Sequence, residues 1–292
     1  MSEPSPGTIR PGIRESLWMA TGAVLLLVVM LTVLHFHKGR SPVEQIAWKE
    51  RRLELVNRLQ VSLATAAEAE KSSVMAITDE DSQKFADQAR AGTVAAEQAR
   101  HELESLLNPA ESNLFTQFTQ RFTELQRVDK EVLDLAVKNT NLKAYALAFG
   151  PGTAAIKEMD ASLAHLTSPA ATEARVAAWR LLASLPPHIA EESDAKMDAM
   201  EAEMAKEDRQ IRQSLAEVAD PTATASYEKF SELRAQIIKL SRENTNVRSL
   251  TLSLTQKRNV TAECQAALAA LQQAIQNEPV AGATLGKVIP AR

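Results

Sequence analysis

Two related stretches decide the fold: KNTNLKAYALAFGPG at residues 138–152 and ENTNVRSLTLSLTQK at residues 243–257. Each places Asn-Thr-Asn inside a run whose apolar residues recur with helical spacing. A shift of 105 residues aligns residues 132–166 with residues 237–271 without a gap, and 10 of the 35 positions are identical. We therefore predict a doubled helical module.

The repeat also predicts where the asparagines lie. In each copy apolar residues are spaced alternately four and three apart, which is the a/d pattern of helices that pack along a seam. Asn139 and Asn244 occupy seam positions and are expected to face the bundle interior, whereas Asn141 and Asn246 face away from the seam. A seam asparagine sets the packing register at some cost in stability, so replacing it with leucine is expected to stabilise the bundle.

A second interpretation of these residues is a polar pocket that binds a ligand through neutral amides inside each bundle. A cation follows each seam asparagine by four residues, where it could hold a carboxylate ligand or belong to a solvated face. The candidate ligand-binding residues are Asn139, Asn141 and Lys143 in the first copy, and Asn244, Asn246 and Arg248 in the second.

Composition limits the possible classes of protein. The chain has 292 residues, of which 45% are apolar and only 4% aromatic, a balance that favours long helices packed through small side chains. A net charge of −4 without a basic stripe argues against binding to nucleic acid. The single cysteine, Cys264, excludes an internal disulfide. We find no phosphate loop, no nucleophile motif and no metal-ligand spacing, so we expect no enzyme activity, no cofactor and no metal.

Residues 16–34, SLWMATGAVLLLVVMLTVL, predict one membrane-spanning helix. These 19 uncharged residues would cover about 29 Å as a helix, which matches the hydrocarbon core of a bilayer. Trp18 at one end and His35 to Lys38 at the other suit the two interfaces. We expect a short tail at residues 1–15 and a transmembrane helix at residues 16–37, and the flanking charges do not decide its orientation.

Proline and glycine divide the rest of the chain into about six long helices. The predicted fold class is all-α: an elongated, doubled up-down helical bundle after one N-terminal transmembrane helix. The expected helices cover residues 43–76, 79–107, 109–149, 153–185, 188–218 and 222–277, with Thr78 as an N-cap and stops at Gly150-Pro151-Gly152 and Pro186-Pro187. The expected domains are a first bundle copy at residues 38–166, a second copy at 167–278 and a tail at 279–292.

Four stretches resemble a known family. They are AEKSSVMAITDEDSQKFADQAR at residues 69–90, NTNLKAYALAFGPG at 139–152, HIAEESDAKMDAMEAEM at 188–204 and NTNVRSLTLSLTQKRNVTAECQAALAALQ at 244–272. They are similar to the four-helix-bundle sensory region of methyl-accepting chemotaxis proteins, and the doubled layout resembles the helical bimodular variant of that region. The similarity covers roughly residues 16–275.

The resemblance implies a domain outside the cytoplasmic membrane that binds small molecules, often carboxylates, and commonly forms dimers. In relatives, ligand contacts often come from arginines on the first helix, and Arg51, Arg52 and Arg58 are the matching candidates here. The expected location is the inner membrane of a bacterium, with a single span and the bundle in the periplasm. The sequence contains neither a second span nor a methylation hairpin, so a signal would have to pass through a partner.

Two functions are compatible with these features. The first is a membrane-anchored sensory or ligand-binding module of chemoreceptor type, acting in signal transduction and chemotaxis through a partner. The alternative is a structural or interaction protein, a membrane-tethered helical spacer without a small ligand. The expected partners are the membrane through Ser16–His37, a second copy or a membrane-spanning protein, and a small carboxylate, but no nucleic acid.

Overall fold

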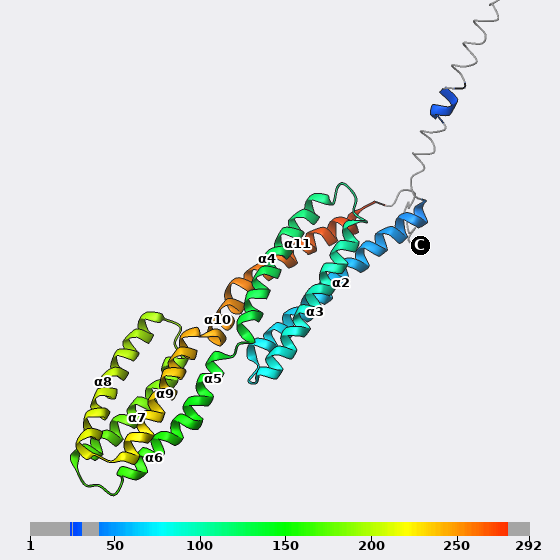
Figure 1. The fold of residues 1–292 in the computed structure, drawn as a ribbon. Helices are drawn as coiled ribbons and strands as arrows, with labels where there is room; N and C mark the ends of the chain where they lie inside the picture. Colours follow the sequence, from blue (N-terminus) through cyan, green and yellow to red (C-terminus); the bar gives the residue numbers. More distant parts are fainter. Residues whose placement is uncertain (1–23, 25, 31–40, 280–292) are drawn as a thin grey trace, which may run out of the picture. The chain divides into compact units, whose positions relative to one another are not determined.

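The computed structural model describes residues 24, 26–30 and 41–279. Every regular element in these residues is helical, and no strand occurs among them, which confirms the all-α prediction (Figure 1). Most of the predicted membrane helix, residues 16–37, lies outside the described residues. Within the described part of the chain, no helix is long and apolar enough to span a bilayer.

The described helices, in chain order, are α2 (Pro42–Met75), α3 (Asp79–Glu104), α4 (Ser112–Ala136), α5 (Thr140–Leu147), the π-helical segment η1 (Ala148–Gly152), α6 (Thr153–Leu163), α7 (Pro169–Ala190), α8 (Asp194–Val218), α9 (Pro221–Glu243), α10 (Thr245–Leu252), the π-helical segment η2 (Ser253–Lys257) and α11 (Arg258–Asn277). The described residues fall into two compact units, and the division lies within α2. Residues 41–51 and 278–279 belong to one unit, and residues 52–277 form the other.

The predicted starts of the first two helices are confirmed within one residue, whereas α3 ends at Glu104, three residues before its predicted end. α2 begins with a reciprocal cap, in which the Ser41 N–H donates to Glu44 Oε2 at 2.7 Å and the Glu44 N–H donates to Ser41 Oγ at 3.3 Å. In the same unit, Lys49 Nζ donates to the Glu278 carbonyl at 2.9 Å. Thr78 caps α3 as predicted, since its Oγ1 accepts from the Asp81 N–H at 3.1 Å.

Within residues 52–277, the helices α2, α3, α4 and α11 form one bundle, which we call bundle A. Phenylalanines of α4 pack in its core, and the rings of Phe118 and Phe122 stack with centroids 5.7 Å apart. Gly92 of α3 lets that helix approach α2 closely, because a Cβ there would lie 3.0 Å from Ala66 Cβ. The remaining core includes Leu55, Val56, Leu59, Leu103, Leu268, Leu271 and Ile275.

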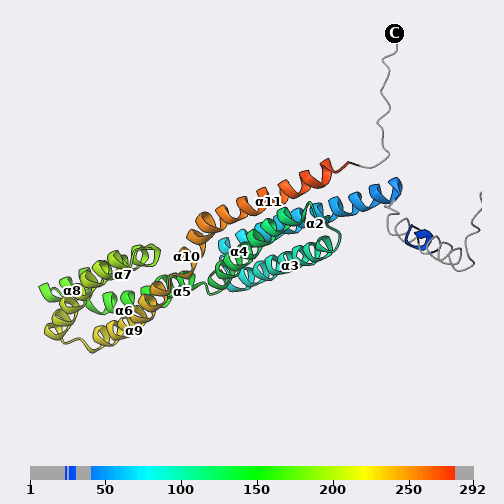
Figure 2. The ribbon, with the colours of Figure 1, turned by 90° about the horizontal axis from the view of Figure 1, so that it is seen from above.

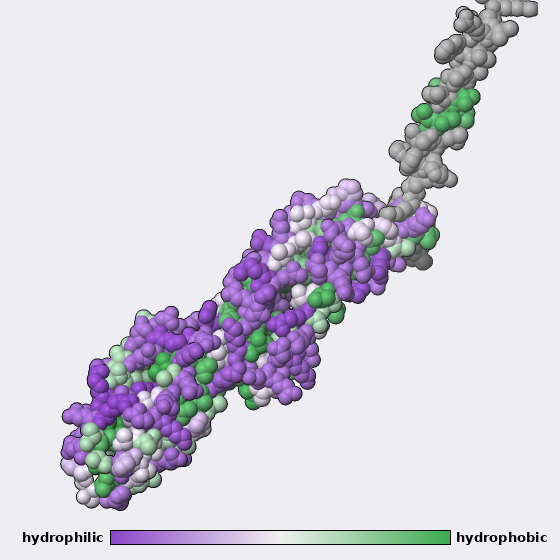
Figure 3. Space-filling model, viewed as in Figure 1, coloured by the Kyte–Doolittle hydropathy of each residue, from purple (hydrophilic) through white to green (hydrophobic). Residues whose placement is uncertain are grey.

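The helices α5 to α9, with η1, form a second hydrophobic core, which we call bundle B. Figures 1 and 2 both show α6, α7, α8 and α9 side by side. α7 contributes a row of buried alanines, which lets neighbouring helices pack closely against it. The larger buried side chains include Ile156, Met159, Leu181, Leu185, Ile211, Leu215, Tyr227 and Phe230. The face seen in Figure 3 is mostly hydrophilic, with apolar groups in small separate patches.

Neither core is built from the helices of a single repeat copy. Bundle A combines α2, α3 and α4 with α11, which comes from the end of the chain's second copy. Bundle B combines α6, from the first copy, with α7, α8 and α9. The division at residue 166, predicted from the repeat, therefore describes the sequence copies and not the hydrophobic cores.

The helices predicted to run straight through the Asn-Thr-Asn stretches are interrupted there, so this part of the prediction was wrong. α4 ends at Ala136 and α9 at Glu243. Asn139 and Asn244 both adopt a left-handed backbone with φ of 52°, and their ψ angles are 38° and 37°. Asparagine tolerates this conformation better than other non-glycine residues. Because the apolar residues keep helical spacing on both sides of each asparagine, the sequence pattern gives no sign of the break.

Two predicted stops are instead crossed by helix. Gly150-Pro151-Gly152 lies in η1 and leads directly into α6, and Pro186-Pro187 lies inside α7, which continues to Ala190. A π-helical turn already changes the ordinary i→i−4 bonding, which makes the missing proline N–H less disruptive. Gly152 permits the local geometry, because a Cβ there would lie 3.0 Å from the Leu147 carbonyl oxygen.

The second copy repeats the irregularities of the first. η2 follows η1 at an offset of 105 residues, the same offset that relates the two left-handed asparagines. Residues 150–152 and 255–257 share no identity, yet both lie in π-helical segments. The repeat is therefore a repeat of backbone conformation as well as of sequence.

A third left-handed residue gives a direct test of these backbone assignments. Ala219 ends α8 with φ of 57°, where an alanine Cβ is strained and glycine is not. Replacing Ala219 with Gly is expected to raise the free energy of unfolding by about 1 kcal/mol. The matched control, Ala216→Gly inside α8, should lower it by about 1 kcal/mol. Urea denaturation of the full chain in micelles measures both, and equal losses from the two changes would contradict the assignment.

Candidate functional site

The two Asn-Thr-Asn stretches meet and cap each other's helices; we call residues 139–141 and 244–246 the junction. The Thr140 N–H donates to Thr245 Oγ1 at 3.2 Å, and the Thr245 N–H donates to Thr140 Oγ1 at 3.1 Å. One residue further on, the Asn141 and Asn246 N–H groups each donate to the other's Oδ1 at 3.1 Å. The first N–H groups of a helix have no partner within it, so α5 and α10 supply one another's missing acceptors.

The side-chain amides extend this reciprocal pattern. Asn141 Nδ2 donates to Asn244 Oδ1 at 2.7 Å, and Asn246 Nδ2 donates to Asn139 Oδ1 at 2.9 Å. Asn139, Asn141 and Asn244 are buried, with at most 4% of their surface exposed. The structure therefore brings together the four asparagines predicted from the sequence, and it engages their amides with one another.

One side of the junction is tied to bundle A through the first residue of α3. Asn139 Nδ2 donates to Asp79 Oδ1 at 3.0 Å, and Lys143 Nζ lies 3.1 Å from Asp79 Oδ2. The hydrogen bond from Lys143 lowers the pKa of Asp79, and the bond from Asn139 acts in the same direction. Lys143 thus contacts Asp79, the residue that ties the junction to α3. Lys143 and its counterpart in the second copy, Arg248, are both exposed.

The other side of the junction is tied to bundle B at the end of α7. Asn141 Nδ2 donates to the Ile189 carbonyl at 2.6 Å, and Asn244 Nδ2 donates to the Glu191 carbonyl at 2.7 Å. Beside them, the fully buried His188 places Nδ1 2.8 Å from Ser241 Oγ. These bonds satisfy carbonyl groups at a helix end that have no partner within the helix.

The candidate arginines of α2 do not join the junction. Arg52 forms a buried ion pair with Glu111, with 2.5 Å between Nη1 and Oε1. Arg58 is about half exposed and lies 3.6 Å from Glu102. Arg51 belongs to the other compact unit and is exposed.

A second polar cluster lies inside bundle A, and sequence reasoning missed it. Lys257, the last residue of η2, places Nζ 2.9 Å from Glu70 Oε2 and also bonds Asp129 Oδ1. The exposed fractions of the Lys257, Glu70 and Asp129 side chains are only 6%, 2% and 9%. Thr93 Oγ1 is 3.3 Å from Asp129 Oδ2, to which it donates. Charges so far from water are tolerated only when they are paired.

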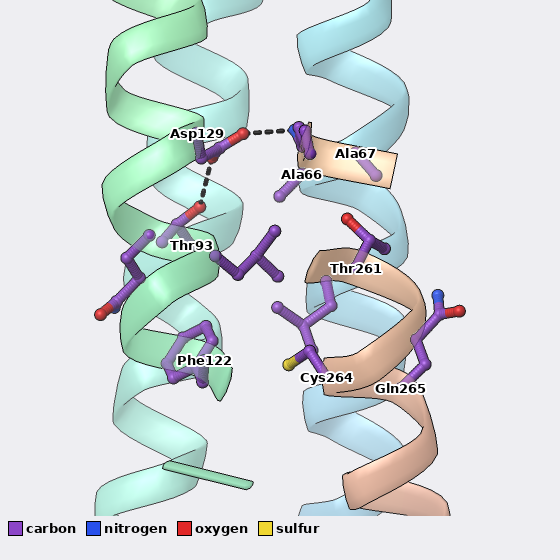
Figure 4. A pocket seen from close by; sticks show the side chains of 12 residues that line it. Ala66, Ala67, Thr93, Phe122, Asp129, Thr261, Cys264 and Gln265 are labelled. Atoms are coloured by element: carbon purple, nitrogen blue, oxygen red, sulfur yellow. Dashed lines mark hydrogen bonds and ion pairs between the residues drawn. The ribbon is translucent and has the colours of Figure 1, made fainter. Parts of the chain in front are cut away.

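A cavity of about 20 Å³ lies beside this cluster, between α2, α3, α4, η2 and α11. Figure 4 shows Thr93, Phe122 and Asp129 on one side and Thr261, Cys264 and Gln265 on the other. The volume is enough for one water-sized guest. Burial raises the pKa of the Cys264 thiol to about 12, so the thiol is unreactive in the folded protein. We call the cavity and the Lys257–Glu70–Asp129 cluster the interior site.

The sequence did hold one signal for the interior site. Lys257 stands where the first copy has Gly152, so a long cation replaces a glycine in one copy only. In an uninterrupted helix Lys257 would lie off the apolar seam, and it would read as a surface residue. A π-helical segment changes the helical phase of the residues around it, and here it places the ammonium in the bundle interior.

Residues 59–178 match a family model described as a four helix bundle sensory module for signal transduction. The matched segment runs from within α2 to within α7 and covers about two fifths of the chain. The match confirms the resemblance inferred from the sequence motifs: this segment is similar to a four-helix-bundle sensory module. Comparisons with curated proteins and with solved structures gave no match.

The junction geometry reverses the effect expected from a seam asparagine. Replacing Asn139 or Asn244 with Leu should lower the free energy of unfolding by about 2–4 kcal/mol, because leucine is strained in the left-handed region and buried partners lose their bonds. The matched control is Asn113→Leu on the exposed face of α4, which should change stability by less than about 0.5 kcal/mol. Urea denaturation measures all three, and a stabilised Asn244→Leu variant would restore the seam interpretation.

Proposed function

We propose that this chain is the sensory component of a membrane-associated signalling system in a bacterium. Residues 16–37 would hold it in the inner membrane, and the helices would lie in the periplasm. The observation that carries the proposal is the match of residues 59–178 to a sensory module for signal transduction. The doubled layout and the quoted motifs, which resemble chemoreceptor sensory regions, support it.

The interior site of bundle A is the proposed place of input. Apolar residues at such positions are often as stable as a buried ion pair or more stable, so stability alone does not explain Lys257, Glu70 and Asp129. The site joins residues of α2, α3, α4, η2 and α11 around one cavity. A guest there would lie among residues of several helices at once and could alter how those helices pack.

In this proposal, the junction transmits a change in the packing of one bundle to the other. Its amides have a structural role and do not bind the ligand. The junction contacts the start of α3 in bundle A and the end of α7 in bundle B through direct hydrogen bonds. Output would then pass to a membrane-spanning partner or a second copy of the chain. The competing function, a helical spacer, requires neither a ligand nor a response.

Ligand binding is tested by thermal unfolding of the full chain in lipid nanodiscs against a panel of small carboxylates, amino acids, amines and sugars. A ligand that binds only the folded state raises stability by about 2.7 kcal/mol at a hundredfold excess over Kd. We expect at least one compound class to raise the Tm in a saturable manner. If every class leaves the Tm unchanged, the spacer function replaces the sensory one.

The periplasmic placement is tested separately with reporters fused to the C-terminus. A reporter that is active only in the cytoplasm should stay dark, and one that is active only in the periplasm should give signal. The matched control carries the same reporters after residue 15, on the opposite side of the predicted span. The reverse pattern would place the helices in the cytoplasm.

A further inference from the structure

The interior site holds more negative than positive charge. Lys257 supplies one ammonium to two carboxylates, those of Glu70 and Asp129. Glu70 Oε1 is buried and has no hydrogen-bond partner among the described residues. The neighbouring Lys71 is exposed and bonds Glu68 instead. A surplus buried carboxylate is costly unless a further cation pairs with it.

We propose that the interior site binds a small ammonium-type cation, of the size of the ammonium ion. This inference rests on the proposed sensory function and names the chemical class of its ligand. The guest pairs with Asp129, and Lys257 then turns fully to Glu70, whose free oxygen gains a donor. Each carboxylate thereby obtains its own cation, and the net charge of the site becomes zero.

The charge balance disfavours the carboxylate that the family resemblance implies. A carboxylate guest would bring a third negative charge into a site whose one ammonium already serves two. Repulsion between like charges is strong in a region that water does not reach. The ligand class at this site therefore follows from the residues of this chain.

Size and hydrogen bonding point to the same guest. The cavity of about 20 Å³ accepts a particle as large as one water molecule, and an ammonium ion has about that size. The lining residues include Thr93, Asp129 and Thr261, whose hydroxyl and carboxylate oxygens can accept hydrogen bonds.

Binding at this site would act directly on a helix that begins at the junction. Lys257 ends η2, and η2 continues α10, whose first residue is Thr245. Lys257 ties η2 to α4 through Asp129 and to α2 through Glu70. A guest at Asp129 would release the tie to α4 and strengthen the tie to α2, and so change the packing of bundle A.

The test uses the full chain in nanodiscs at fixed pH and ionic strength. Ammonium chloride should raise the Tm in a saturable manner, whereas sodium chloride and tetramethylammonium chloride should not. Modification of Cys264, which lines the cavity, gives a second readout. Its rate should fall by a factor of 1 + [L]/Kd, about tenfold at nine times Kd, because the guest opposes opening of the bundle.

Two matched substitutions on α2 localise the effect. Glu70→Gln removes the surplus charge with little change in shape, so it should raise the Tm without ammonium and abolish the response to it. Glu68→Gln changes an exposed carboxylate two residues away and should leave the response intact. Circular dichroism confirms that both variants fold, and a Glu70→Gln protein that still responds to ammonium would overturn the proposal.

The remaining outcomes separate this inference from the proposed function. If carboxylates or sugars raise the Tm and ammonium does not, the cation site is wrong and the sensory function stands. If no compound of either panel has an effect, both fail. A Tm that rises on acidification but not with ammonium would show that a proton alone neutralises the cluster, and it would also overturn the proposal.

Discussion

The first N–H groups of a helix must find acceptors outside it, and this requirement shapes the junction. α5 and α10 meet it by facing each other, so that Thr140 and Asn141 cap one helix while Thr245 and Asn246 cap the other. The arrangement works only if the chain turns sharply just before each helix. The left-handed asparagines make that turn, and their amides then bond across to the opposite copy.

The assignment of helices to the two cores follows from this crossing. After Asn139 the chain leaves bundle A and builds bundle B, and after Asn244 it returns along α10 and α11 to complete bundle A. Bundle A therefore cannot close its core until the whole of bundle B has been traversed. Residues as distant as Leu55 and Ile275 belong to one core, although 220 positions separate them.

The sequence predicted the features that depend on pattern. The period of the apolar residues indicated an all-α fold, and Thr78 followed by three acidic residues indicated the start of α3. The offset of 105 residues aligned Asn141 with Asn246, and these two residues proved to be in contact. The sequence-based prediction failed where one backbone angle, or one extra residue in a helical turn, determines where a helix breaks or which way a side chain points. A left-handed asparagine and a π-helical segment leave the apolar period nearly intact on both sides, so the breaks at residues 139 and 244 and the inward turn of Lys257 stayed hidden.

The meeting of the two copies has a further consequence for how this architecture can vary. The chain enters and leaves bundle B at the same point, the junction, where Asn141 Nδ2 and Asn244 Oδ1 lie 2.7 Å apart. A segment whose two ends adjoin behaves as an inserted domain, because its removal or exchange leaves its host's chain ends where they were. The helices between the two asparagines could thus be shortened, lengthened or replaced by another helical hairpin without altering the path of α4 into α11. Recombination at the Asn-Thr-Asn codons would be a simple genetic route to proteins that share bundle A and differ in bundle B.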